Sequence, residues 1–186
     1  MTSTEEHGEP VPFPFALDEA GTVLAGLDRM RAVVEWKCGG LDAAAMNKTL
    51  GPSTMTLGGL VKHLAFTEEG HFATHWHGRQ PGPPWDAVDW DADEDWEWHS
   101  AAVDSPEELM GLWRAAVDRS RKDVDEALAS ASPGGLGRLK TPDGHSPNLR
   151  YILVSLLEEY ARHVGHIDLI RESLDGTVGE DPPERP

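Results

Sequence analysis

The chain has 186 residues, about one to one and a half typical domain lengths, which predicts one compact domain. Its 16 lysines and arginines stand against 33 aspartates and glutamates, and the net charge of −17 argues against a groove for nucleic acid or an anionic membrane surface. The hydrophobic content of 39% is enough for a core, so a wholly disordered chain is excluded.

A single cysteine, Cys38, excludes an intramolecular disulfide framework and any multi-cysteine zinc or iron–sulfur site. No motif surrounds it, so we expect a buried or incidental thiol. The first fifteen residues lack the positive start and apolar run of a signal peptide, and no stretch of about 18 apolar residues could span a membrane. We therefore expect a soluble cytoplasmic protein with no membrane-spanning segment.

Apolar residues recur with helical period in four places. The first predicted helix runs from about Phe15 to Lys37 and ends before a pair of glycines. The second begins near Ser53 or Thr54, one of which is expected to cap it, and continues towards Gly78.

Between the second and third predicted helices lies an acidic segment, residues 80–104. Seven acids between Asp86 and Glu97 are interleaved with tryptophans, namely Trp85, Trp90, Trp96 and Trp98. We interpret it as a long crossover connection whose indoles pack on the bundle while the carboxylates stay in water. A calcium loop is rejected, because Trp96 stands where an EF-hand needs glycine and Ala102 where it needs the bidentate glutamate.

The third predicted helix has the clearest start. Ser105-Pro106-Glu107-Glu108 combines a capping serine, a proline at the first helical position and a glutamate that completes a capping box. The fourth opens with Ser146-Pro147 and ends near Asp175-Gly176, and its apolar positions follow alternating steps of four and three. This pattern is typical of a helix bundle. We therefore expect a bundle over residues 15–176, a flexible N-terminus over 1–14 and a disordered tail over 177–186.

The informative stretch is residues 158–172, EEYARHVGHIDLIRE. At about 100° per residue, Glu159, His163 and His166 fall within an arc of roughly 60° at the edge of the apolar stripe. The i, i+4 spacing lets the carboxylate of Glu159 and the imidazole of His163 converge on one ion. A third ligand has to come from another helix, and His63 is the natural candidate.

Helical periodicity leaves other interpretations open. A histidine on an apolar face is more often a hydrogen-bonded core residue than a ligand, and Glu-x-x-x-His also arises as an ordinary surface pair. On a helical wheel His63 lies on the flank of its helix, whereas His71 and His75 fall nearer the apolar stripe. Periodicity alone would choose these two as ligands; we expect them instead to be exposed residues near the helix end.

The segments MTLGGLVKHLAFTEE and EEYARHVGHIDLIRE, with the acidic crossover between them, resemble the DinB-like superfamily in its uncharacterised actinobacterial branch. The resemblance covers about Leu17 to Gly176 and implies an all-α four-helix bundle with a bound divalent metal. Carried over residue by residue, it places the metal ligands on His63, Glu159 and His163, with His166 three positions beyond the last. Glu159 departs from the commoner histidine, and this glutamate form resembles mycothiol-dependent maleylpyruvate isomerase.

The resemblance implies a metal-dependent enzyme that activates a thiol such as mycothiol for transfer to a small electrophile or for its isomerisation. Zinc is the first expectation for the ligand set, and nickel, iron and manganese stay open. His166 is expected as a hydrogen-bond partner of a ligand, a fourth ligand or a proton shuttle. Arg150 and Arg162 are candidates for binding a substrate carboxylate, although a helix arginine more often faces solvent.

Two alternatives to this enzyme stay open. The same ligands would serve hydrolysis, or a non-catalytic module that binds metal or a stress-related small molecule. A homodimer is expected only by analogy.

Overall fold

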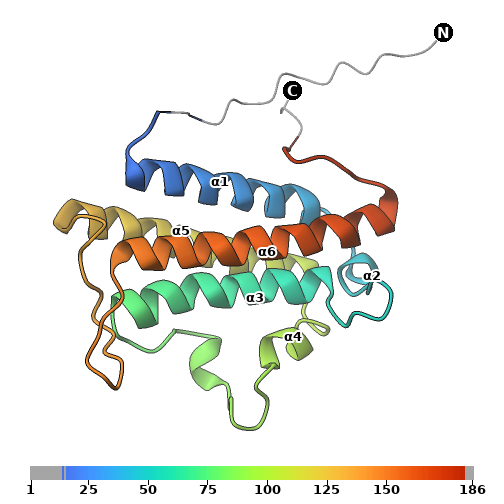
Figure 1. Cartoon of the computed structure of the whole chain (residues 1–186). Helices are drawn as coiled ribbons and strands as arrows, with labels where there is room; N and C mark the ends of the chain where they lie inside the picture. The colour runs from blue at the N-terminus through green and yellow to red at the C-terminus, as the bar shows by residue number, and fades with distance from the viewer. Residues whose placement is uncertain (1–13, 15, 183–186) are drawn as a thin grey trace.

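The computed structural model describes residue 14 and residues 16–182, so most of the predicted flexible N-terminus lies outside the described residues. The first helix begins at Glu19, with Asp18 as its cap, and not near Phe15 as predicted. Within the described residues the chain is an all-α bundle with four long helices, which is the fold that the resemblance implies (Figure 1). Its long helices are α1 (Glu19–Cys38), α3 (Leu57–Glu69), α5 (Pro106–Ser130) and α6 (Leu149–Asp175), with α3 continued by the π-helix η1 (Gly70–Trp76). Three short helices complete it: α2 (Ala43–Met46), η2 (Trp85–Ala87) and α4 (Trp96–Ser100).

The start of α5 confirms the predicted capping box. The Ser105 hydroxyl accepts a hydrogen bond from the backbone N–H of Glu108, and the Glu108 carboxylate accepts one from the backbone N–H of Ser105. Both bonds satisfy amide groups that a helix start would otherwise leave without a partner.

Two other predicted helix starts are wrong by a few residues. Thr56, rather than Ser53 or Thr54, caps α3. The cap of α6 is Asn148, whose side-chain oxygen accepts a hydrogen bond of 2.8 Å from the backbone N–H of Tyr151. Ser146 cannot serve there, because its hydroxyl donates to the carbonyl of Leu139.

The four long helices bury one continuous apolar core. In Figure 1, α6 lies in front, with α1 above it, α3 below it and α5 behind. The fully buried residues come from α1, α3 and α6 in particular: Leu27, Val34, Leu57, Leu60, Val61, Leu64, Ile152, Leu156 and Ile167. Burial of each such side chain stabilises the folded state by about 1.5–3 kcal/mol. The apolar core therefore holds the helices in place around the polar residues at their contacts.

A charged cluster lies inside this core, and we call Arg31, Glu68, Trp113 and Tyr160 the core ion-pair cluster. The Arg31 guanidinium donates to both oxygens of Glu68, at 2.8 and 2.9 Å. The Tyr160 hydroxyl donates to Glu68 at 2.7 Å and accepts from the Trp113 indole N–H at 2.8 Å. Burial alone would lower the pKa of Arg31, but the Glu68 carboxylate outweighs it and raises that pKa. The cluster therefore supplies its own counter-ion and hydrogen bonds.

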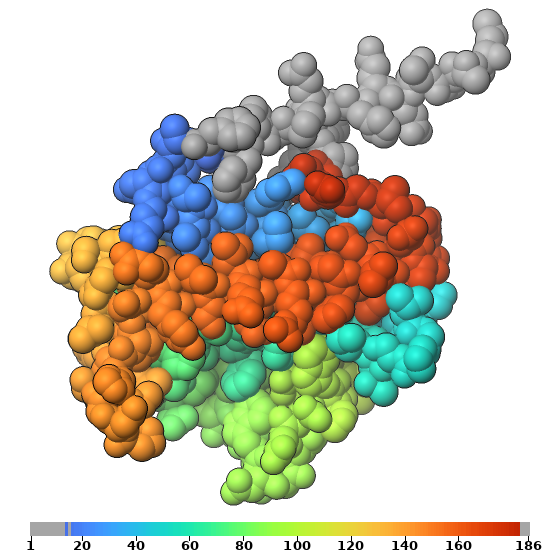
Figure 2. Space-filling view, viewed as in Figure 1, coloured from blue at the N-terminus to red at the C-terminus, as the bar shows by residue number. Residues whose placement is uncertain are grey.

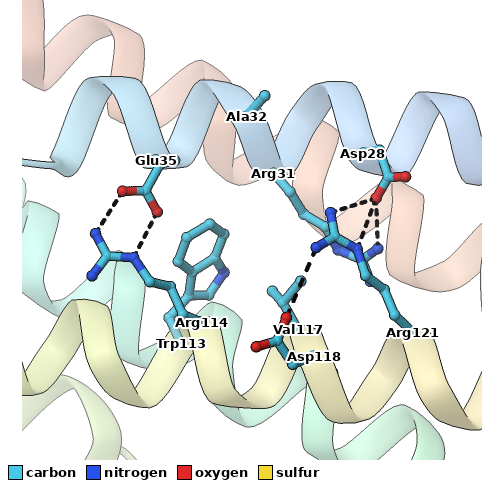
Figure 3. Close-up of a pocket in the computed structure, with 9 residues that line it drawn as sticks. All are labelled: Asp28, Arg31, Ala32, Glu35, Trp113, Arg114, Val117, Asp118 and Arg121. Atoms are coloured by element: carbon cyan, nitrogen blue, oxygen red, sulfur yellow. Dashed lines mark hydrogen bonds and ion pairs between the residues drawn. The ribbon is translucent and has the colours of Figure 1, made fainter.

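A cavity of about 290 Å³ lies between α1 and α5 (Figure 3). Ion pairs cross it: the Arg114 Nε lies 2.8 Å from a Glu35 oxygen, and an Arg121 nitrogen lies 2.9 Å from Asp28 Oδ1. Arg31 closes its inner side. Since each of its three guanidiniums has a carboxylate partner, the cavity is bordered by interhelical salt bridges.

The crossover segment, residues 80–104, covers α3 on the side away from α1. In Figure 2 it forms the lower part of the visible face, and α3 emerges in a strip between it and α6. The Phe66 ring lies 5.0 Å from the Trp85 ring and 4.8 Å from the Trp90 ring, centroid to centroid. The prediction that the indoles pack on the bundle is confirmed. Most of the acids are exposed as expected, but Glu97 is buried.

Cys38 is expected to be a buried or incidental thiol, and the segment after α6 a disordered tail. Cys38 is buried, and burial raises the pKa of its thiol to about 12, which makes it unreactive. Beyond α6, the Asp181 carboxylate accepts from Arg29 at 2.7 Å, while the disorder expected for residues 177–186 stays a prediction. Across the described part of the chain, no helix combines the length and apolar character needed to cross a bilayer.

Candidate metal centre

The centre lies where α3 and α6 run side by side in opposite directions (Figure 1). The rings of His63 and His163 meet with their centroids 4.8 Å apart. Eight residues further on, at the start of η1, His71 Nε2 lies 3.2 Å from the hydroxyl of Ser155 in α6. The two helices are antiparallel, so residue numbers rise along one helix as they fall along the other. Glu159, halfway between Ser155 and His163 in sequence, therefore lies between these two contacts.

His63, Glu159 and His163 form what we call the His–Glu–His cluster. One carboxylate oxygen of Glu159 lies 3.3 Å from His163 Nε2 and 3.7 Å from His63 Nε2. One ligand atom from each residue lies within 4.8 Å of the other two. In the described part of the chain this is the one group of three such residues with that convergence. The structure thus brings together three residues that are 96 and 4 positions apart in sequence.

Two consecutive residues of α4 contact the ring of His63. Glu97 Oε1 lies 3.1 Å from His63 Nδ1, and the Trp98 indole stacks on the imidazole with centroids 4.7 Å apart and planes 23° apart. A carboxylate only accepts hydrogen bonds, so Nδ1 has the proton and Nε2 directs its lone pair towards Glu159. Sequence reasoning missed both residues, because nothing local distinguishes Glu97 from the other acids of the crossover segment.

His163 of α6 is buried, with 7% of its surface exposed. Burial, together with the nearby His63 and His166, lowers its pKa to about 4, although Glu159 opposes this shift. The imidazole is therefore neutral near pH 7, with a lone pair free for a ligand. His166 Nδ1 lies 3.4 Å from His163 Nδ1, so one proton joins the two rings.

The donor set fits a divalent cation. The Nε2 atoms of His63 and His163 converge on one carboxylate oxygen of Glu159, at 3.7 and 3.3 Å. Nitrogen and oxygen donors of this kind suit zinc, nickel, iron or manganese. Such a set leaves a divalent ion with a net charge of about +1 and coordination positions for a further ligand.

The expectation that His71 and His75 are exposed is wrong. His71 is 8% exposed; its Nδ1–H donates to the Thr67 carbonyl at 2.8 Å, and its Nε2 faces the Ser155 hydroxyl. Burial lowers its pKa. His75 is half-buried beside it, where Leu139 of the following loop donates to the His75 carbonyl. The loop before α6 covers this helix end, which the helical wheel could not show.

The two arginines suggested for a substrate carboxylate are exposed and paired. Arg150 forms an ion pair with Glu19, and an Arg162 nitrogen lies 3.9 Å from Glu158 on the same helix. Exposed pairs of this kind contribute little to stability. The carboxylate partners of both arginines, Glu19 and Glu158, lie outside the His–Glu–His cluster.

A family model described as "MST: Mycothiol-S-transferase" matches residues 22–176. The match begins in α1 and ends at the residue that caps α6, so it includes all four long helices, the crossover segment and the His–Glu–His cluster. No curated protein matches the chain.

Proposed function

We propose, since the chain belongs to the mycothiol S-transferase family, that it joins the sulfur of mycothiol to a small electrophile at a divalent metal centre. The observation that supports this proposal is the convergence of His63, Glu159 and His163, whose ligand atoms lie within 4.8 Å of one another. Zinc is the expected ion for two histidines and a glutamate, with nickel, iron and manganese as the other candidates.

The residues have separate roles in this proposal. His63 Nε2, His163 Nε2 and a Glu159 oxygen would hold the ion, which when bound would stabilise the thiolate form of a thiol. The His163 ring keeps its proton on Nδ1, directed at His166 Nδ1 3.4 Å away. His166 thereby favours the tautomer in which the lone pair of His163 is on Nε2 and available to a cation.

The transfer itself requires one proton acceptor and one leaving group. The S–H bond of the thiol breaks, the sulfur electron pair forms the new C–S bond, and the leaving group departs with the electron pair of its bond to carbon. The thiol proton passes to solvent, because the Nδ1 lone pair of His166 is already used in accepting from His163.

A conjugation assay tests this proposal. The zinc-loaded protein is mixed with mycothiol and, in parallel, with a haloarene (1-chloro-2,4-dinitrobenzene), an epoxide or a haloalkane, and the thioether product is measured. We expect product formation that is lost in Glu159→Gln and after treatment with a chelator. A protein that binds zinc but forms no thioether with any of these electrophiles contradicts transferase activity and favours the non-catalytic binding module.

A further inference from the structure

We propose that α4 of the crossover segment positions the metal ligand His63, with Glu97 fixing its tautomer and Trp98 fixing the plane of its ring. The inference rests on the proposed function in one respect, namely that the His–Glu–His cluster binds a divalent cation. It assigns a role to a segment that sequence analysis explained only as a covering connection.

The burial of Glu97 is the first observation. Of the seven acids between residues 86 and 97, five are exposed, whereas Glu97 is 5% exposed. One of its oxygens, Oε2, is buried without a hydrogen-bond partner, and the other lies 3.1 Å from His63 Nδ1. Burial of a carboxylate is costly unless a charged or hydrogen-bonding group offsets it. Here the imidazole N–H is the partner, so the position of Glu97 is explained by His63 and not by packing.

The contact has a definite effect on a metal ligand. A carboxylate that accepts from one ring nitrogen of a histidine keeps the proton there, and it makes the other nitrogen a stronger donor to a cation. Glu97 in this way selects Nε2 of His63, the nitrogen that faces Glu159. With Glu159, it also brings two negative charges to a site for a dication.

Trp98 and Gly59 supply an independent observation. The Trp98 ring packs so closely on α3 that a Cβ atom at Gly59 would lie 2.8 Å from Trp98 Cε3 and 3.2 Å from the Thr56 hydroxyl oxygen. Glycine inside a helix costs about 1 kcal/mol relative to alanine. The glycine allows the indole to lie flat on the helix one turn before His63 and to stack on its ring.

Lys62 of α3 makes further contacts with the crossover segment, at Trp96 and Asp104. Lys62, which precedes His63, has its amino group 2.5 Å from Asp104 Oδ2 and 4.4 Å from the centre of the Trp96 ring. Lys62 is 3% exposed, so both contacts are largely shielded from water. The crossover segment is therefore attached to α3 on both sides of the contacts that Glu97 and Trp98 make with His63.

Metal titration of Glu97→Gln tests the inference without any measurement of activity. Zinc affinity is measured by competition with a chromogenic chelator, and the absorption bands of the cobalt-loaded protein report the geometry around the ion. We expect zinc binding about 10–100-fold weaker than in the unchanged protein, with altered cobalt bands. The control is Glu94→Gln, which removes the same charge from an exposed position of the same segment and should leave both readouts unchanged.

Gly59→Ala provides the second test, because it touches no ligand and raises the helical propensity of α3. We expect weaker zinc binding with the helical circular dichroism retained, since the added Cβ displaces Trp98. The control is Gly111→Ala on α5, where no atom lies within 4 Å of an added Cβ.

Unchanged zinc affinity and cobalt bands in both Glu97→Gln and Gly59→Ala would overturn the positioning role while the proposed function stands. If the unchanged protein binds neither zinc nor cobalt, the proposed function fails, and the positioning role fails with it.

Discussion

The helices α3 and α6 bring polar groups together in two places, and the two clusters differ in how their charges are balanced. In the core ion-pair cluster, the Glu68 carboxylate accepts from Arg31 and Tyr160, so its negative charge is neutralised within the protein. In the His–Glu–His cluster, Glu159, the sequence neighbour of Tyr160, lies 3.7 and 3.3 Å from the Nε2 atoms of His63 and His163. A buried cluster with its own cation stabilises the fold, whereas convergent acceptors require a cation from solution.

Glu68→Ala should have the largest effect on stability. It leaves the Arg31 guanidinium, 4% exposed, without its main partner, and the loss of one member of a buried ion pair costs about 3–5 kcal/mol. The free energy of unfolding is measured by urea titration of the metal-free protein, with Glu158→Ala, at an exposed position of α6, as the control. A loss below about 1 kcal/mol would show that the core cluster does not stabilise the bundle.

Tyr160→Phe makes the comparison sharper, because this residue is adjacent to Glu159. Without the hydroxyl, the Trp113 indole N–H loses its acceptor and Glu68 loses a donor, so we expect a loss of about 1–3 kcal/mol in urea unfolding. Zinc affinity should stay within a factor of about two. A marked loss of zinc binding in the folded variant would mean that the two clusters work as one unit.

A smaller effect concerns pH. Burial lowers the pKa of His71 below its usual value of 6.5, although Glu68 and Glu159 partly oppose this. Above pH 6.5 the histidine is neutral in both states; as the pH falls below 6.5, the unfolded chain takes up the proton first and the folded state loses stability. This loss approaches about 1.4 kcal/mol per pH unit for each such histidine until the folded pKa is reached.

The pH effect is measured by urea unfolding of the metal-free protein at pH 7.5 and pH 5.0. We expect His71→Gln to lose less stability between these two pH values than the unchanged protein does. The same change at the exposed His145 serves as the control. Equal losses in the unchanged protein and in His71→Gln would contradict the assignment of a buried neutral imidazole to position 71.

The bundle and part of its centre could be predicted from sequence because their signals are local. The capping box at Ser105 and the i, i+4 pair Glu159 and His163 each lie within one or two helical turns. His63 needed the family resemblance, since its own helical wheel placed it on the flank. The contacts of its ring with Glu97 and Trp98 of the crossover segment are invisible on a wheel of α3 alone.

The contacts that sequence could not supply are those between distant elements. Glu97 is 34 residues from His63, and Arg31 is 37 residues from Glu68. An acid in a segment of seven acids has no local feature that marks it as buried, and an arginine in an amphipathic helix usually faces water. Only the packing of α4 on α3, and of α1 against the core, selects these side chains.

The most direct measurement is the metal content of the purified protein, determined by elemental analysis beside His163→Ala prepared in the same way. We expect about one divalent ion per chain in the unchanged protein and almost none in the variant. Equal metal content in the two proteins, or none in either, would contradict a cation held by His63, Glu159 and His163.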